Sequence, residues 1–218
     1  MYTLRLYHDR FEPNAKTNPD LEAQHSMVYV YQGTAEVNGQ LLAKDTAVYR
    51  PDVTTIEAGP YGATVWRWEV VRGSEPNNLG RGEGIQSHLR MSRRIRMFEL
   101  VPTSKWVFRL DSVINNEGST GLHSHPGSGI RCLLEGHLRV ESEKGECSDN
   151  WHPGDAWYEE GSYPLVSTSD EGEKASFMRG MILPPDYVRY PSMAVWIEGR
   201  KLCKNDWKSY VLKLITLR

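Results

Sequence analysis

The sequence predicts an all-β protein made of two related barrels in tandem, and three observations support this prediction. Short apolar runs alternate with turn residues, since the 218-residue chain contains 19 Gly and 12 Pro. No segment longer than about ten residues keeps a helical period of apolar side chains. The predicted strands begin roughly every ten residues, which is typical of sandwiches and barrels. They cover residues 28–31, 47–49, 63–71, 96–100, 106–113, 130–134, 137–142, 156–158 and 175–183.

A weak internal repeat predicts where the two barrels lie. A strand, Gly33 and a second strand follow one another in the first half, and the same order recurs around Gly136. Asp45 and Asp155 then begin a further strand in each copy, and the Gly-rich stretch 72–84 between the copies has the composition of a linker. We therefore expect an N-terminal degenerate barrel over residues 1–72, a linker over 73–95, a C-terminal barrel over 96–190 and a C-terminal strand or tail over 191–218.

The end of the chain carries one more predicted strand. Residues 211–215 are mostly apolar, with Lys213 among them. This strand could complete the first barrel or pair with a dimer partner.

Composition excludes several classes of partner. The net charge of −2 and the pI near 6.4 argue against nucleic acid or an anionic membrane as the main partner. No stretch approaches the ~20 apolar residues of a membrane span. Three cysteines, Cys132, Cys147 and Cys203, are too few and too scattered for a disulfide framework. Residues 1–5 lack the form of a signal peptide, so we expect a cytoplasmic protein.

The most informative stretch of the chain is His123-Ser124-His125, followed by Gly129 and closed by Gly136. Alternate residues of a strand point to one face, so the two imidazoles converge. The stretch resembles the first motif of the cupin superfamily, His-x-His-x(3,4)-Glu-x(6)-Gly. Both His and the final Gly are in register, but Gly129 stands where the motif has its acidic ligand.

The second cupin motif, Gly-x(5)-Pro-x-Gly-x(2)-His-x(3)-Asn, is only partly present. Counted from Gly154, its Pro, Gly, His and Asn positions fall on Glu160, Ser162, Leu165 and Ser169. The position of the third metal-binding His is therefore Leu165. The resemblance nonetheless implies a bicupin, that is, two double-stranded β-helix (jelly-roll) barrels in tandem, and it implies a homodimer.

Two readings of the paired His remain open. In the first, His123 and His125 bind a divalent transition metal (Fe, Mn, Ni or Zn), and Glu159, Cys132, water or a chelating substrate completes the coordination. In the second, both His are hydrogen-bonded lining of a metal-free pocket.

Arg131 also has two readings. If position 129 points into the barrel, strand alternation points Arg131 inward too and places a guanidinium where the acidic ligand is missing. Such a guanidinium would attract an anionic ligand. Alternatively, Arg131 points outward and pairs with a surface acid such as Glu141.

The first barrel is expected to be a scaffold. Its cupin positions for His, His and Glu fall on Asp20, Glu22 and Ser26, counted back from Gly33. On the strand 63–71, Arg67 and Glu69 are two residues apart and can pair on one face.

The resemblance implies a small-molecule-binding protein, and a metal-dependent dioxygenase, lyase or isomerase acting on an acidic or oxygenated metabolite is the first hypothesis. In it Arg131 orients a substrate carboxylate and Glu159 acts as a base or an additional ligand. Trp157 and Leu165 form the pocket wall, and Tyr163 contacts substrate. The alternative is a non-catalytic ligand-binding or structural cupin that has lost its metal site. A third hypothesis, metal-free epimerisation, would use His125 with Tyr163 as an acid–base pair.

Overall fold

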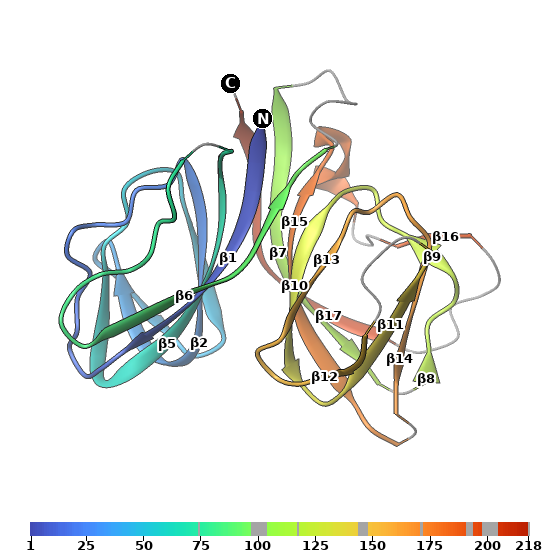
Figure 1. The fold of residues 1–218 in the computed structure, drawn as a ribbon, viewed down its shortest axis with the longest axis horizontal. Helices are drawn as coiled ribbons and strands as arrows, with labels where there is room; N and C mark the ends of the chain where they lie inside the picture. The colour runs from blue at the N-terminus through green and yellow to red at the C-terminus, as the bar shows by residue number, and fades with distance from the viewer. Residues whose placement is uncertain are drawn as a thin grey trace. The chain divides into compact units, whose positions relative to one another are not determined.

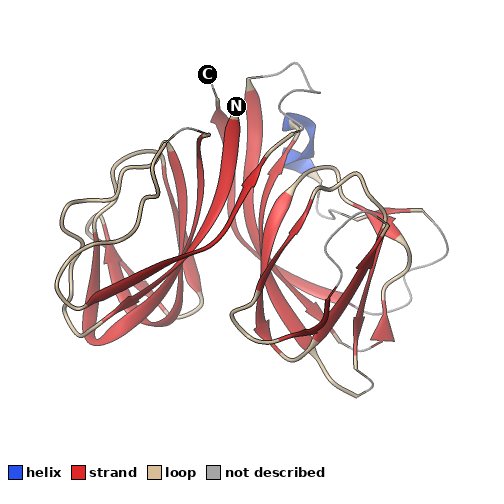
Figure 2. Cartoon of the chain, in the orientation of Figure 1, coloured by secondary structure: helices blue, strands red, loops and turns tan. Residues whose placement is uncertain are grey.

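The computed structural model describes residues 1–73, 75–96, 104–116, 118–143, 148–170, 172–190, 194–197 and 205–217. Within these ranges the chain forms strands and one short 3-10 helix, η1 (Pro185–Arg189), which confirms the all-β class (Figures 1 and 2). The chain divides into two compact units, Met1–Ile95 and Arg96–Arg218.

The first unit is an antiparallel sheet of six strands that curls around an apolar core (Figure 1). The strand order is β3-β2-β5-β1-β6, and β4 also pairs with β2. Val28, Ile56 and Val65 belong to the buried apolar cluster that these strands enclose. The strands are β1 (Tyr2–Phe11), β2 (His25–Val37), β3 (Gln40–Ala43), β4 (Thr46–Arg50), β5 (Ile56–Arg72) and β6 (Ile85–Arg94).

The second unit consists of two antiparallel sheets, as expected of a jelly roll. One has the order β13-β10-β15-β7-β17; the other has the order β12-β11-β14-β9-β16, with β8 paired to β14. Trp157, Leu165 and Phe177 lie in the apolar cluster of this unit. Its strands are β7 (Lys105–Asn115), β8 (Gly118–Ser119), β9 (His123–Ser124), β10 (Gly129–Glu135), β11 (Leu138–Ser142), β12 (Ser148–Trp151), β13 (Ala156–Glu159), β14 (Leu165–Ser169), β15 (Ala175–Leu183), β16 (Val195–Trp196) and β17 (Asn205–Thr216).

Strand register confirms the internal repeat. Gly33, inside β2, and Gly136, directly after β10, have φ of 77° and 76°, a conformation that favours glycine. Five residues before each glycine, Val28 pairs with Arg67 and Arg131 pairs with Arg179. Arg67 and Arg179 are therefore equivalent positions of the two units.

The register also corrects the alignment of the following turns. The amide of Asp45 donates to the carbonyl of Val30, and that of Gly154 donates to the carbonyl of Leu133. Asp45, which has a positive φ of 61°, is thus equivalent to Gly154 and not to Asp155.

The segment predicted as a linker, 73–95, contains a strand. Residues 85–94 form β6, which pairs with β1 along the edge of the first sheet, and the unit boundary falls after Ile95. On β6 the apolar residues Ile85, Leu89 and Met91 are only half-buried, and the exposed residues, at positions 86, 88, 90 and 94, are all polar. An edge strand of this kind lacks the apolar run by which buried strands are recognised.

The last strand pairs neither with the first barrel nor with a dimer partner, the two possibilities that the sequence suggested. β17 pairs with β7 of its own unit, with Val211 opposite Leu110 and Ile215 opposite Trp106. About a hundred residues separate the two strands in sequence, so no local pattern specifies the pairing. Of the other predictions, residues 97–100 of the strand 96–100, residues 191–193, 198–204 and 218 of the tail, and Cys147 and Cys203 lie outside the described ranges.

Among the described residues, no helix is long and apolar enough to cross a membrane. The homodimer implied by the resemblance is not tested by a single chain and stays a prediction.

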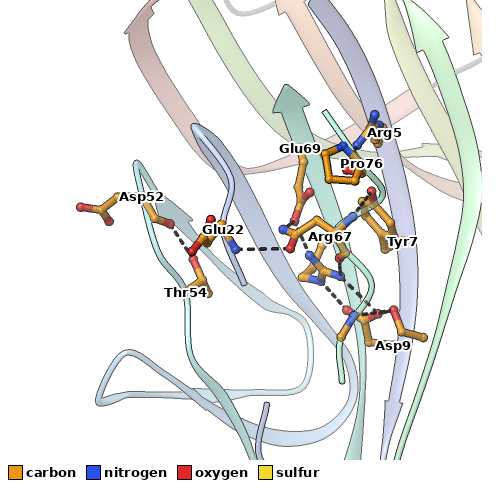
Figure 3. Close-up of polar contacts among 12 residues, drawn as sticks. Arg5, Tyr7, Asp9, Glu22, Asp52, Thr54, Arg67, Glu69 and Pro76 are labelled. Atoms are coloured by element: carbon orange, nitrogen blue, oxygen red, sulfur yellow. Dashed lines mark hydrogen bonds and ion pairs between the residues drawn. The ribbon is translucent and has the colours of Figure 1, made fainter. Parts of the chain in front are cut away.

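The interior of the first barrel holds a buried ion cluster. Figure 3 shows Arg67 between Asp9 and Glu69, and all three side chains are fully buried. Arg67 donates to both carboxylates, so the predicted pair of Arg67 and Glu69 is confirmed. The Arg67 guanidinium also lies 4.6 Å from the centre of the Tyr7 ring.

The chain itself covers this cluster. Arg5 donates to the carbonyls of Pro76 at 2.7 Å and Glu75 at 2.6 Å, and Arg67 donates to the carbonyl of Asn78 at 2.9 Å (Figure 3). The side-chain amide of Asn78 in turn donates to Glu69 at 3.0 Å. Segment 75–78 thus provides hydrogen-bond partners for Arg5, Arg67 and Glu69. This supports the interpretation of the first unit as a scaffold.

Replacing Glu69 by Gln should change how stability depends on pH. Burial, followed by repulsion from Asp9, raises the pKa of Glu69 from 4.5 to about 7, although Arg67 opposes this shift. A carboxyl whose pKa is raised by folding contributes stability that is complete below the unfolded pKa and is lost as pH rises through the folded pKa. In Glu69→Gln, the fall in unfolding free energy between pH 4.5 and 7 should be smaller, as measured by urea denaturation. Glu36→Gln, an exposed change on β2, is the control, and equal pH profiles for all three proteins would contradict the assignment.

Candidate functional site

A small cavity inside the second barrel brings several of the predicted residues together. Its volume is about 70 Å³, a little over twice the ~30 Å³ that one water molecule takes up in the liquid. Ionisable side chains occupy part of its wall, and apolar and hydroxyl side chains form the rest. The lining residues are Val113, Asn115, Thr120, His123, His125, Glu159, Ser167, Phe177, Arg179, Ala194, Trp196, Asn205 and Trp207.

The two predicted His meet in this cavity. Their ring centres are 5.0 Å apart, as alternation along an extended segment predicts, and both side chains are buried. Nδ1 of His123 donates to the carbonyl of Gly121 at 2.8 Å, which fixes the tautomer and leaves a lone pair on Nε2. Burial, and then the proximity of His125, lowers the pKa of His123 to about 4. At neutral pH the His123 ring is therefore uncharged and able to bind a cation.

Glu159 supplies the carboxylate that the first motif lacks. It lies on β13 directly opposite Gly129 of β10, the motif's acidic position. Its Oε2 is 3.1 Å from Nε2 of His125, and its Oε1 accepts a hydrogen bond from Trp157 at 2.8 Å. Burial raises the pKa of Glu159, but the Arg131 guanidinium, together with His125 and Trp157, lowers it below its ordinary value. Glu159 is therefore an anion at neutral pH.

Arg131 points into the barrel and is fully buried. Its Nη2 lies 2.7 Å from Oε2 of Glu159, and its Nη1 donates to the carbonyl of Gly129 at 2.6 Å. The alternative prediction, in which Arg131 points outward and pairs with Glu141, is wrong. Arg131 is buried, and Glu141 instead accepts a hydrogen bond from Arg139 at 3.0 Å. Arg131 does not line the cavity, so it can act on a ligand only through Glu159.

Residue 129 has room only for glycine. A Cβ atom there would lie 2.7 Å from the carbonyl oxygen of Gly180, 2.7 Å from Cγ of Met181 and 2.9 Å from Nη1 of Arg131. No side chain fits there without a shift of these neighbours. The motif position therefore has no acidic side chain, and Glu159 lies opposite it on the neighbouring strand.

Sequence reasoning missed Arg179, the positively charged group on the cavity wall. Asp111 accepts two hydrogen bonds from Arg179, at 2.7 and 3.0 Å, and one from Arg109 at 2.7 Å. The signal was the presence of charged residues within two apolar strands, Arg109 and Asp111 in β7 and Arg179 in β15, because charges there must be paired inside the protein.

The other predicted site residues do not line the cavity. Trp157 packs against Phe177 at 5.3 Å between ring centres, and Leu165 is paired with His123 in register. Tyr163 is half-buried before β14. Cys132, the alternative metal ligand, is buried but, like Trp157, Leu165 and Tyr163, is not a lining residue. Instead, β16 and β17, from the segment expected to be a tail, provide Trp196, Asn205 and Trp207.

Comparison with known proteins gives the fold but no specific activity. No protein-family model and no curated protein matches the chain. Oxalate decarboxylase from Bacillus subtilis, at pH 4.6, is similar in structure at 14% sequence identity and a TM-score of 0.56, over 83% of this chain and 68% of that chain. A structure of the same enzyme from work on its Mn(II) centres is similar at 14% identity and a TM-score of 0.58, over 88% and 71%. Coverage this wide includes both units, and the predicted tandem cupin fold is confirmed.

Replacing Arg131 by Met should destabilise the second unit strongly. The change removes the cation beside Glu159 and leaves a buried carboxylate without its charge partner, which typically costs about 3–5 kcal/mol. Denaturant unfolding measures the loss. The matched control is Arg139→Met, which breaks an exposed pair on β11 and should change stability by about 0.5 kcal/mol or less. Equal, small effects of the two substitutions would contradict the role given to Arg131.

Proposed function

Because the chain has the tandem cupin fold, we propose that the second barrel binds a small carboxylate or a similarly oxygenated molecule beside a divalent metal ion. His123, His125 and Glu159 are the metal ligands, and Arg179 receives the anionic group of the ligand. The observation that carries this proposal is the position of Glu159, opposite Gly129 and 3.1 Å from His125. Two imidazoles and one carboxylate in a cavity form a ligand set common to redox-active and hydrolytic metal sites.

The residues of the cavity fit a metal ion in three respects. Two imidazoles bound to one tetrahedral ion at about 2.1 Å have ring centres roughly 5 Å apart, close to the 5.0 Å between His123 and His125. The hydrogen bond from His123 to Gly121 is the outer contact that commonly orients a metal-binding imidazole. Oε2 of Glu159 is buried and lies 3.1 Å from Nε2 of His125, so a carboxylate oxygen stands beside one of the two imidazoles. A bound ion would polarise an oxygen atom of the ligand as a Lewis acid.

Arg131 limits how strongly the metal binds. It shares Oε2 of Glu159 at 2.7 Å and reduces the electron density that this oxygen can donate. In the described part of the chain, the one set of three or more such side chains with ligand atoms all within 4.8 Å of one another is His137, Asp170 and Glu173. The three donors of the cavity are more widely spaced, so Glu159 has to turn from Arg131 to complete the site.

Size and charge favour a small anionic ligand. A cavity of about 70 Å³ admits a molecule of only a few heavy atoms. Asp111 takes Nε and Nη2 of Arg179, which leaves Nη1 available to a ligand carboxylate. The similar Bacillus subtilis structures are of an oxalate decarboxylase, and oxalate is therefore the first ligand to test.

A second candidate function is metal-free anion binding, without catalysis. The observation that favours it is the ion pair of Arg131 and Glu159, which already satisfies the charge of the carboxylate. In this case Arg179 donates hydrogen bonds to the anion through Nη1, and His123 and His125 form part of the pocket wall.

Metal content should depend on the two His of the cavity. Protein purified without an affinity tag or chelator, carrying His137→Ala to remove the surface group, should contain one divalent metal ion per chain by elemental analysis. Adding His123→Ala and His125→Ala should abolish this content, because a single carboxylate cannot retain the ion. Protein that stays metal-free after loading with iron, manganese, nickel and zinc would overturn the metal reading and favour the second candidate.

Carboxylate binding should depend on Arg179. Arg179→Lys keeps the charge but loses the paired geometry, and oxalate should bind about ten- to a hundredfold more weakly, corresponding to about 1.5–3 kcal/mol for a hydrogen bond to a charged group. Isothermal titration measures the affinity. The control is Arg139→Lys on the surface. An unchanged affinity in Arg179→Lys would exclude the proposed anchor.

A further inference from the structure

A group of His, Asp and Glu side chains, the residue types that commonly ligate metal ions, lies on the surface of the second unit, separate from the cavity. His137 is in the turn between β10 and β11, His152 is between β12 and β13, and Asp170 and Glu173 are between β14 and β15. Gly136 brings two of these connections into contact, since a Cβ atom there would lie 2.1 Å from the carbonyl oxygen of Lys174. Three separate connections between the two sheets therefore place their polar side chains in one location.

The spacing of the side chains suits a single ion. The ligand atoms of His137, Asp170 and Glu173 all lie within 4.8 Å of one another. The ring of His152 is 5.3 Å from that of His137 and nearly perpendicular to it, at 77°, but its nitrogens are outside this set, so His152 has to turn to become a fourth ligand. Two imidazoles on one tetrahedral ion have ring centres roughly 5 Å apart.

The chemistry of the group also suits a transition metal. Nδ1 of His137 and Oδ2 of Asp170 are 3.8 Å apart, too far for a hydrogen bond, and both side chains are at least half exposed. Two carboxylates supply negative charge, and two imidazole nitrogens select a borderline ion such as Zn²⁺ over Mg²⁺ or Ca²⁺.

We propose that His137, Asp170 and Glu173, joined by the neighbouring His152, form a surface site for a zinc-like divalent ion that ties together three connections between the two sheets of the second barrel. The site does not depend on the proposed function of the cavity. Because the ligands come from three connections, a bound ion stabilises the folded unit relative to the unfolded chain, in which the ligands are apart.

The test uses a protein whose cavity cannot bind metal. In a His123→Ala/His125→Ala background, Zn²⁺ is titrated by calorimetry, and the unfolding temperature is measured with and without Zn²⁺. We expect one equivalent of zinc and a higher unfolding temperature. Adding His137→Ala should abolish both effects, and adding Asp170→Asn should weaken binding at least tenfold. Adding His88→Ala, which removes an exposed His on β6, should change neither.

Two outcomes would overturn the surface site. One is the absence of zinc binding in the His123→Ala/His125→Ala background. The other is zinc binding that is unchanged by His137→Ala and Asp170→Asn. Unfolding in the presence of EDTA checks that each variant folds, so loss of binding is not confused with loss of structure. The metal content of the cavity is measured separately, in the His137→Ala background. A negative result for the surface site therefore does not count against the cavity, and the reverse also holds.

Discussion

The buried ion pair between Arg131 and Glu159 is the interaction on which the second barrel depends. Neither charge can be accommodated alone in the interior, since an unpaired buried charge costs several kcal/mol. Gly180, Met181 and the guanidinium together leave no room for a side chain at residue 129. The carboxylate of Glu159, from β13, lies next to His125. The ion pair thus holds a buried carboxylate beside an imidazole, on the strand opposite the motif position that lacks an acid.

The two barrels use equivalent positions in different ways. Arg67 and Arg179 occupy the same place in the strand register and both pair with buried carboxylates. In the first barrel, a second carboxylate and the carbonyl of Asn78 complete the partners of Arg67. In the second barrel, Arg179 borders an open cavity. The same fold therefore provides one unit whose interior guanidinium is surrounded by protein groups and one unit whose equivalent guanidinium lies on the wall of a cavity.

The sequence predicted the features that depend on local pattern. Strand alternation and turn glycines gave the all-β class, and the His-x-His spacing placed His123 and His125 together. Features that depend on pairing between distant strands were not predicted. Glu159 meets Gly129 only through the register of β10 with β13, and β17 meets β7 across about a hundred residues. The direction of Arg131 could not be decided because a surface partner, Glu141, was equally compatible with the sequence. Arg179 was overlooked because its strand, β15, has the apolar pattern of a core strand.

A crystal structure of the protein soaked with Mn²⁺, with the ion located by anomalous scattering, tests the central claim most directly. If Glu159 replaces the missing acid of the motif, the ion should lie in the cavity, within about 2.2 Å of a nitrogen of His123, a nitrogen of His125 and an oxygen of Glu159. Glu159 would then have turned from Arg131 toward the two imidazoles. An empty cavity, with Glu159 still paired to Arg131 and Mn²⁺ absent at saturating concentration, would contradict this account.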